Sequence, residues 1–369
     1  MAGIVGSYAL TKLQVRSIFT HSRQRQLLRI VGTAVMIIYA AITIFPFYVL
    51  FVRTFVSTKD STELHLWIPP AQEISMDAQV GNLAVFYNLD LKRVKEALGI
   101  PQTEFLQSRI TLKQISERYN IPPERIKGYF AGFHTYNGWI TLLSGADFWL
   151  ALGRTLLVTV ASLVGLTILS IFTGYGLAGL RRRGQMIIYN VYLLQMVIPA
   201  MLIILPQFMI VQWFARLLPG YDSPGLLRSV IQLLIVVLIN IKGGAVSTMI
   251  MTSFIGAIPK EIEEAAQLDG ASQMQYMRHI LFPLLKVPVA SLVVIMLPQF
   301  WNQFLEPFVY LDQSNTTLLP LIQNLSGVYS TNFQILYTAV FVSILPLAVV
   351  YLVFRRFFIE GAMAGAVKG

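Results

Sequence analysis

Long apolar runs alternate with short polar segments along most of the 369-residue chain. A helix needs roughly 20 mostly apolar residues to cross the hydrocarbon core of a bilayer, because each residue adds about 1.5 Å of rise. Six segments meet this condition, and the fourth contains Lys242: 30–52, 155–180, 184–215, 226–258, 287–305 and 333–354. The pattern therefore predicts an all-α, polytopic membrane protein with six membrane-spanning helices.

Composition agrees with this prediction and excludes several functions. Apolar residues make up 55% of the chain and charged residues only 12%, which is too few for an ordinary cytosolic enzyme. There is no cysteine, and the four histidines are scattered without ligand spacing, so a metal site is not expected. The sequence also lacks the Gly-x-x-x-x-Gly-Lys-Ser/Thr run that binds ATP phosphates. We expect a non-catalytic chain that holds no cofactor.

The basic residues lie mainly on one side of the predicted spans. The two terminal segments and the loops after spans two and four carry fourteen Lys and Arg residues, whereas the opposite short loops carry only Arg216 and Arg228. Short loops rich in Lys and Arg stay in the cytoplasm, so we expect both termini there, with cytoplasmic segments at 1–29 and 359–369 and a transmembrane core at 148–358. The net charge of +10 then reflects membrane orientation and no nucleic-acid partner is expected.

One long segment, 53–147, separates the first two spans and is expected outside the cell. Its ten cations and ten anions cancel, so it lacks the basic face that DNA binding requires. Within it, residues 91–101 and 112–122 match as a weak repeat with a period of 21, and their apolar residues recur at helical spacing. Each copy predicts a short helix, a tight turn and the start of another helix after a proline. We therefore expect a compact helical insert at about 77–136.

The loop between spans four and five, 259–283, has the pattern of two short amphipathic helices. Pro259 and the glutamates after it suit the first turn of a helix, Gly270 can end that helix, and Ser272 can cap a second one. Small side chains would let a partner approach closely at Ala265, Ala266 and Ala271. The alternative is an interfacial loop without a partner.

This loop resembles the EAA loop of permease subunits of bacterial ABC importers. The resemblance rests on Glu264-Ala-Ala-x-x-x-Gly270, followed after nine residues by Ile-x-x-Pro283, and it departs only at Phe282, where leucine is usual. In that family the loop docks in a groove of the ATPase subunit. The resemblance implies that this chain is coupled to an ATPase through Glu261, Glu264, Ala265, Ala266, Leu268, Asp269, Gly270 and Ala271.

Other segments resemble the MalG-type subunits of maltose-like carbohydrate importers. They are 173–184, 195–199, Leu205-Pro206, 300–305 with Gln303 in place of the usual acid, 317–321 and the tail 356–369. The resemblance covers about 30–75 and 138–369 and leaves the insert out. It implies the type I ABC importer (MetI-like) fold in the bacterial inner membrane. The partners it implies are an ABC ATPase dimer, a MalF-like second permease, an extracytoplasmic solute-binding protein, and a sugar or oligosaccharide substrate.

Polar side chains within the predicted spans are candidates for lining a transport path, because an unpaired polar group in lipid is costly. They are Gln195, Gln207, Gln212, Asn240, Lys242, Asn302, Gln303 and Glu306. Each could instead bridge two helices. Lys242 lies about 16 residues, roughly 24 Å, from the cytoplasmic end of its span. Its charge is explained either by pairing within the bundle, for example with Glu306, or by attraction of an anionic substrate such as a uronate.

Several alternative interpretations remain open from the sequence. The chain could be an ABC permease for phosphate, amino acids or polyamines. It could also be a secondary transporter or a membrane-tethered sensor. An ion-coupled transporter would be expected to carry carboxylates inside its spans, and only Glu306 comes close. The aromatic residues around Tyr129–Trp139 suit packing and interfacial anchoring or carbohydrate stacking. For an importer, we expect the insert to dock the binding protein or to cap the exterior mouth.

Overall fold

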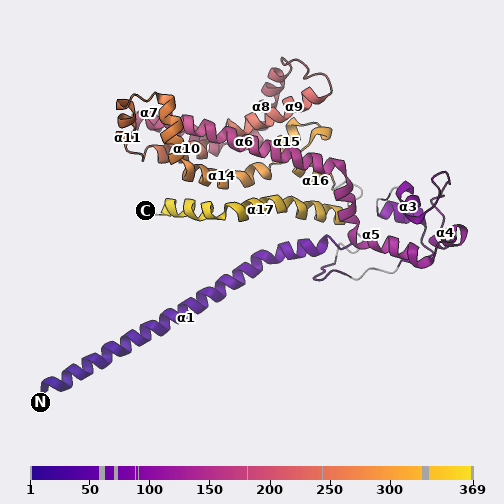
Figure 1. Ribbon diagram of the computed structural model, residues 1–369, viewed down its shortest axis with the longest axis horizontal. Helices are drawn as coiled ribbons and strands as arrows, with labels where there is room; N and C mark the ends of the chain where they lie inside the picture. Colours follow the sequence, from indigo (N-terminus) through magenta and orange to yellow (C-terminus); the bar gives the residue numbers. More distant parts are fainter. Residues whose placement is uncertain are drawn as a thin grey trace. The chain divides into compact units, whose positions relative to one another are not determined.

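The computed structural model describes residues 2–57, 63–69, 74–87, 89, 91–180, 182–242, 244–325 and 332–366. Within these ranges the chain is helical and contains no strand; one isolated antiparallel bridge joins Gln79 to Thr111 (Figure 1). The all-α class predicted from the sequence is therefore confirmed for the described chain. The chain divides into two compact units, Met1–Asn137 and Gly138–Gly369, and the second is called the transmembrane unit below.

The first unit begins with a single long helix, α1 (Ala2–Arg53), which contains the first predicted span. Its part Gln26–Arg53 is long and apolar enough to cross a membrane. The helix starts far upstream of residue 30, where the predicted span begins, and side chains 26–48 are all exposed. An apolar helix with this exposure is stable only against lipid or another apolar surface.

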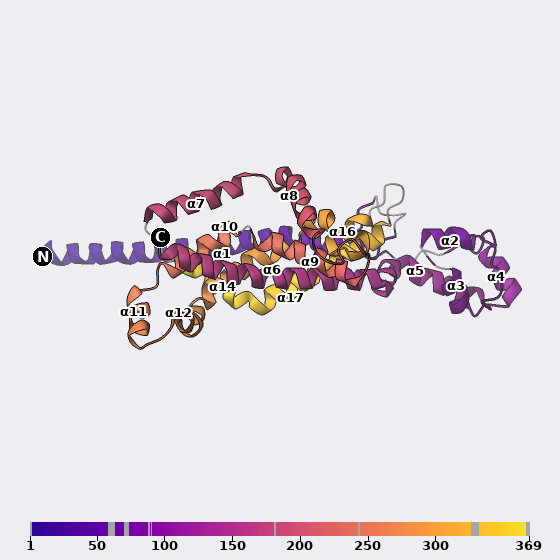
Figure 2. The same ribbon diagram turned by 90° about the horizontal axis from the view of Figure 1, so that it is seen from above.

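The remainder of the first unit is a small helical module, here called the insert module, with a core of its own (Figure 2). It comprises α2 (Val80–Phe86), α3 (Leu91–Leu98), α4 (Leu112–Tyr119) and the first part of α5 (Pro123–Ser144). Its buried side chains include Val80, Val94, Leu98, Leu112, Ile115, Ile126 and Phe130. Apolar burial is the main source of stability for such a module.

The insert module repeats with a period of 32 residues, and the predicted period of 21 is wrong. Residues 87–95, Tyr-Asn-Leu-Asp-Leu-Lys-Arg-Val-Lys, align with residues 119–127, Tyr-Asn-Ile-Pro-Pro-Glu-Arg-Ile-Lys, so α2–α3 corresponds to α4–α5. The two copies exchange equivalent hydrogen bonds, since Val80 N donates to Ile110 O (2.9 Å) and Leu112 N donates to Ala78 O (3.0 Å).

The sequence match with a period of 21 results from the similar ends of α3 and α4. These helices are not equivalent, because α3 is the second helix of the first copy and α4 is the first helix of the second copy. Gly99 (φ 76°) and Asn120 (φ 51°) both adopt the left-handed conformation, and each is followed by Ile-Pro. The helix predicted to start after the second proline is α5, but residues 101–110 form turns and loop instead of a helix. Both predicted short helices therefore form, whereas only one is followed by a second helix.

In the transmembrane unit the central element is α6 (Ala146–Ala178), which contains the second predicted span. Helices packed against α6 or against one another are α9 (Leu226–Ile241), α10 (Ala245–Ile255), α14 (Lys286–Trp301), α16 (Leu318–Asn324) and α17 (Phe333–Ala366). At Gly174, α6 approaches α10 so closely that an added Cβ would lie 2.8 Å from Met251 Cβ. Small residues at such crossings are typical of helices that pack within membranes.

Five predicted spans correspond to apolar helices, but the third does not form one continuous helix. Three described helices are long and apolar enough to cross a membrane: Gln26–Arg53, Ala146–Ala178 and Phe333–Arg355. Two further pairs of helices are apolar enough if each pair is counted as one span, which gives up to five spans. The helices of each pair are bent relative to each other, by 52° for Leu226–Ile241 with Ala245–Ile255 and by 67° for Gln273–Leu284 with Lys286–Trp301.

The predicted third span, 184–215, is divided at Pro199 into α7 (Arg182–Val197) and α8 (Ala200–Ala215). Pro199 has no amide proton and adopts an extended ψ of 131°, which interrupts helical hydrogen bonding. Of these two helices, only the part Met201–Ala215 has the composition of an apolar helix, and it is shorter than 18 residues, so the count of six spans stays a prediction.

Candidate functional site

The pair of short helices predicted within 259–283 is present, and this segment is here called the coupling loop. α11 (Lys260–Leu268) follows Pro259 and ends before Gly270, whose φ of 81° turns the chain. Ser272 caps α12 (Gln273–Tyr276): its Oγ accepts from Gln275 N, and Gln275 Oε1 accepts from Ser272 N at 2.7 Å. The predicted helix pair, its glycine turn and the serine cap are therefore confirmed.

The predicted coupling residues divide into an exposed group and a packed group. Glu261, Glu264, Ala265, Leu268, Asp269 and Gly270 are exposed. Leu268 is 89% exposed and lies beside the exposed Asp269. Ala266 is buried in the core of the unit, and Ala271 is half-buried. The surface available to a partner is therefore formed by one face of α11 and the turn after it.

Hydrogen bonds and a ring contact that the sequence did not predict join the coupling loop to the C-terminal end of α6. Tyr175 Oη donates to Glu263 Oε1, and the Gln273 side-chain amide donates to Tyr175 Oη. Tyr276 is buried and packs on Tyr175, with 6.4 Å between the ring centroids. Both helices of the loop are thus attached to the same end of α6. Glu263 could be seen in the sequence only as a helix N-terminal acid, because Tyr175 lies 88 residues away.

Two of the predicted path-lining residues bridge helices in the structure. Asn240 and Gln303 form two hydrogen bonds with each other, at 2.7 and 3.0 Å between their amide nitrogens and oxygens. Asn240 Nδ2 also donates to Ser162 Oγ at 2.9 Å, so α6, α9 and the turn after α14 meet here. Because α14 ends at Trp301, Asn302 and Gln303 lie after the end of this helix.

Lys242 lies where the fourth predicted span breaks, at the C-terminal end of α9. It is exposed, and among the described residues no carboxylate oxygen lies within 4.0 Å of its ammonium group, so the ion pair suggested with Glu306 is not formed. Together with Gln207, Lys242 lines an otherwise apolar groove of about 680 Å³ between α8 and α9. Gln195 on α7 and Asn302 are exposed, and Glu306 is half-buried in α15 (Leu305–Tyr310).

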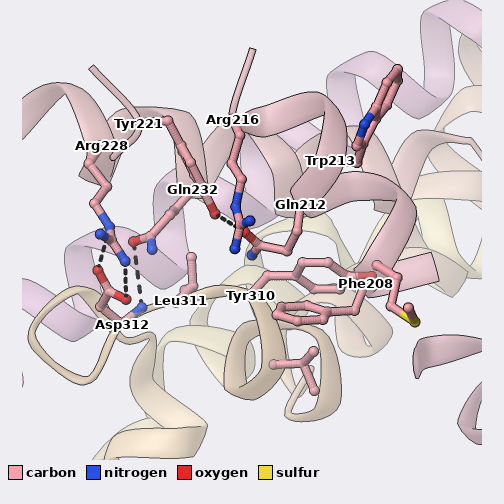
Figure 3. Close-up of a pocket in the computed structure, with 12 residues that line it drawn as sticks. Phe208, Gln212, Trp213, Arg216, Tyr221, Arg228, Gln232, Tyr310, Leu311 and Asp312 are labelled. Atoms are coloured by element: carbon pink, nitrogen blue, oxygen red, sulfur yellow. Dashed lines mark hydrogen bonds and ion pairs between the residues drawn. The ribbon is translucent and has the colours of Figure 1, made fainter. Parts of the chain in front are cut away.

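A second hollow, here called the arginine pocket, is lined by residues of α8 and α9, which lie away from α11 in the ribbon diagram (Figure 1). Figure 3 shows the side chains that line it. It has a volume of about 560 Å³ and is formed by the end of α8, the start of α9 and the segment after α15. Residues that line it include Phe208, Gln212, Trp213, Arg216, Tyr221, Arg228, Gln232, Tyr310 and Asp312. Gln212 was a candidate for lining a transport path, and it lies here.

Two pairs of polar side chains lie around the arginine pocket (Figure 3). Arg228 contacts both carboxylate oxygens of Asp312, at 2.9 and 3.1 Å, and lies 5.7 Å from the Tyr221 ring centroid. Tyr221 Oη donates to Gln212 Oε1 at 3.0 Å. Arg216 and Arg228 stood out in the sequence as the two cations of the sparsely charged loops, but their pocket was not predicted.

Comparison with known proteins gives one family and several relatives. The family model described as binding-protein-dependent transport system inner membrane component matches residues 167–359, more than half of the chain. The arabinooligosaccharides transport system permease protein AraQ of Bacillus subtilis is 26% identical over 208 residues, covering 55% of this chain and 69% of AraQ. The diacetylchitobiose uptake system permease protein DasC of Streptomyces coelicolor is 24% identical over 236 residues, covering 64% and 81%.

A solved structure shares the fold. A chain of a bacterial ABC transporter involved in the import of the acidic polysaccharide alginate aligns with a TM-score of 0.59 and 17% identity. The alignment covers 91% of this chain and 98% of that one. At this identity the similarity concerns the fold, and the family match is what carries the relationship to transport proteins.

Proposed function

The chain belongs to the family of inner membrane components of binding-protein-dependent transport systems, and we propose that it is the permease subunit of an ATP-driven importer of sugars or oligosaccharides. Several relatives are permeases of carbohydrate transport systems, including those named for arabinooligosaccharides and diacetylchitobiose. In this role the chain forms part of the translocation path, and a separate subunit hydrolyses ATP. Family membership also argues against a secondary transporter or a sensor.

The observation that carries this proposal is the construction of the coupling loop. α11 and α12 are attached to α6 through Glu263, Gln273 and Tyr175, while Leu268 and the neighbouring acids stay exposed. A partner that binds this exposed face can therefore move the end of α6 directly. ATP-driven closure of an ATPase pair would pull the coupling loop and rotate the attached helices between two arrangements.

The proposed topology follows the charge distribution. The coupling loop and both termini lie in the cytoplasm, six spans cross the inner membrane, and the insert module lies outside. A second, MalF-like permease chain would close the path and cover the exposed apolar surface of α1. An extracytoplasmic binding protein would deliver the sugar from the same side as the insert module.

Co-purification with the ATPase subunit tests the coupling role. Gly270→Pro should disrupt the turn, because proline cannot adopt a φ of 81°. Leu268→Asp and Glu264→Ala should weaken association with the ATPase subunit and lower sugar-stimulated ATP hydrolysis, while the permease still inserts into the membrane. Asp147→Ala, at an exposed acid in the first turn of α6 and outside both the coupling loop and the insert module, is the matched control and should leave both quantities unchanged. Native association and coupling in all three loop variants would show that the coupling role is wrong.

The insert module is proposed to dock the binding protein or to cap the exterior mouth. Deleting residues 77–136 should then reduce stimulation of ATP hydrolysis by the loaded binding protein, without preventing assembly of the permease with its ATPase. Full stimulation in the deletion variant would exclude both roles. Because the module has its own core, its removal takes away few of the buried apolar residues of the transmembrane unit.

A further inference from the structure

The arginine pocket has no role in the coupling mechanism, although its chemistry differs from that of the rest of the transmembrane unit (Figure 3). Its volume of about 560 Å³ lies within the range of sites that hold small ligands, roughly 300–1,000 Å³. It is separate from the groove beside Lys242, since the two hollows are lined by different residues of α8 and α9.

The carboxylate and side-chain amide oxygens that line the pocket already have partners. Both Asp312 oxygens are bound by Arg228. Gln212 Oε1 accepts from Tyr221, and Gln232 Oε1 accepts from Asn315 Nδ2 at 3.1 Å. The side-chain groups left for a ligand are therefore mainly N–H donors, which favours a ligand rich in oxygen acceptors.

The pocket also carries one uncompensated positive charge. Arg228 and Asp312 neutralise each other, whereas no carboxylate oxygen among the described residues lies within 4.0 Å of the Arg216 guanidinium. Arg216 extends toward Gln212 and the interior of the pocket (Figure 3). A guanidinium offers two parallel donors that match the geometry of a carboxylate.

Aromatic rings supply the apolar part of the lining. Phe208 and Tyr310 pack with 5.6 Å between their centroids, and Trp213 is 62% exposed at the edge of the pocket. Flat aromatic surfaces bind the C–H faces of sugar rings, because both surfaces are apolar and rigid. Ligands whose oxygens accept hydrogen bonds but that have no apolar face, such as inorganic anions, would leave the aromatic rings of the pocket uncovered.

We propose that the arginine pocket binds a saccharide unit that carries a carboxylate, with Arg216 pairing with the carboxylate and Trp213 contacting the ring. This inference rests on the proposed function, which supplies the sugar substrate and places this end of the unit on the exterior side. The pocket then acts as an entry site that favours acidic over neutral saccharides.

Binding to the assembled transporter in phosphatidylcholine membranes tests the proposal. The probe is a trimer of galacturonic acid, and the matched neutral probe is the corresponding trimer of galactose. The native complex should bind the acidic trimer more tightly. Arg216→Gln should weaken this binding at least about tenfold, as expected for a charge-assisted contact, and change binding of the neutral trimer less than twofold. Arg183→Gln, at an exposed arginine of α7, should change neither.

Trp213→Ala is a second variant and should weaken binding of both trimers. Equal affinity for the two trimers in the native complex, or unchanged affinity for the acidic trimer after Arg216→Gln, would overturn the proposal. A lipid headgroup is the competing ligand. If adding phosphatidylglycerol to the membranes abolishes binding of the acidic trimer through Arg216, or if the pocket retains this lipid and binds no trimer, the saccharide assignment is wrong.

The same preparation separates this inference from the proposed function. The complex could assemble with its ATPase and import neutral sugar, yet bind the acidic trimer equally well with and without Arg216. That result would refute only the proposal that the arginine pocket binds an acidic saccharide. A chain that neither associates with an ATPase subunit nor supports import of any saccharide would refute the proposed function.

Discussion

The contacts inside the insert module differ in kind from the contacts inside the transmembrane unit. The insert module encloses a nearly continuous apolar core, and several of its side chains, such as Val94 and Ile126, have no exposed surface. In the transmembrane unit, polar pairs recur between helices, such as Ser170 with Ser247 (2.7 Å) and Asn240 with Gln303. In water apolar burial drives folding, whereas in lipid it gives little preference for one helix arrangement over another, so close packing and polar contacts specify it.

The largest effect should come from removing core volume in the insert module. Leu112 is fully buried, and Leu112→Ala should destabilise the module by about 2–5 kcal/mol, because transfer free energy and packing are both lost. Hydrogen exchange of the full-length chain would measure the loss within residues 74–130. Phe105→Ala, at a side chain that is 84% exposed, should change stability by no more than about 0.5 kcal/mol. Equal effects of the two substitutions would contradict an apolar core as the main source of stability.

A smaller effect is expected from forcing two transmembrane helices apart. Gly174→Val places a Cβ near 2.8 Å from Met251 Cβ and 3.0 Å from Thr252 N, so α6 and α10 must separate at a cost of about 1–3 kcal/mol. Thermal unfolding in detergent would show the loss. Gly176→Ala, in the same helix but with no atom within 4 Å of the added Cβ, should be tolerated. If both variants unfold at the native temperature, close approach does not stabilise this crossing.

The Asn240–Gln303 pair should contribute about 1 kcal/mol, in the range found for polar contacts between membrane helices. Asn240→Leu or Gln303→Leu alone leaves the other amide without its partner, and the double variant removes both amides. A double-mutant cycle on unfolding free energy should therefore give a double variant that is more stable than the sum of the two losses predicts. Strict additivity would mean that the two residues do not interact.

The smallest effect concerns alkaline pH in the insert module. Desolvation and the hydrogen bond from Tyr119 Oη to Glu104 raise the pKa of Tyr119, although Arg118 acts in the opposite direction. The folded state thus keeps the phenol proton more tightly than the unfolded state does. Its contribution to stability is complete below the unfolded pKa of about 10 and is lost as pH rises through the folded pKa. Tyr119→Phe should remove this part of the pH dependence in hydrogen exchange, and an unchanged profile would contradict it.

Much of the fold followed from local patterns in the sequence. Hydropathy located α1, α6 and α17, and the order of proline, glutamates, glycine and serine located the coupling loop and its cap. These features depend on residues within one or two helical turns of each other. The break at Pro199 was visible as a proline, but averaging hydropathy over a long run concealed it.

The parts that escaped prediction depend on residues far apart in the chain. Glu263 meets Tyr175 across 88 residues, and Arg228 meets Asp312 across 84. A single sequence gives no signal for such pairs, because many arrangements of the same helices satisfy the same apolar pattern. The period of 32 is present in the sequence, but the similar helix ends at Gly99 and Asn120 also produce a match with the shorter period of 21.

The internal repeat of the insert module limits how this part of the chain can change. Each copy presents its apolar face to the other, and their backbones are joined by the bridge between Gln79 and Thr111. A gene that lost one copy would encode a half-module with its apolar face open to water, so the two copies must be inherited or lost together. The two copies of the insert module therefore form one inseparable unit, and a related permease is expected to contain both copies or neither.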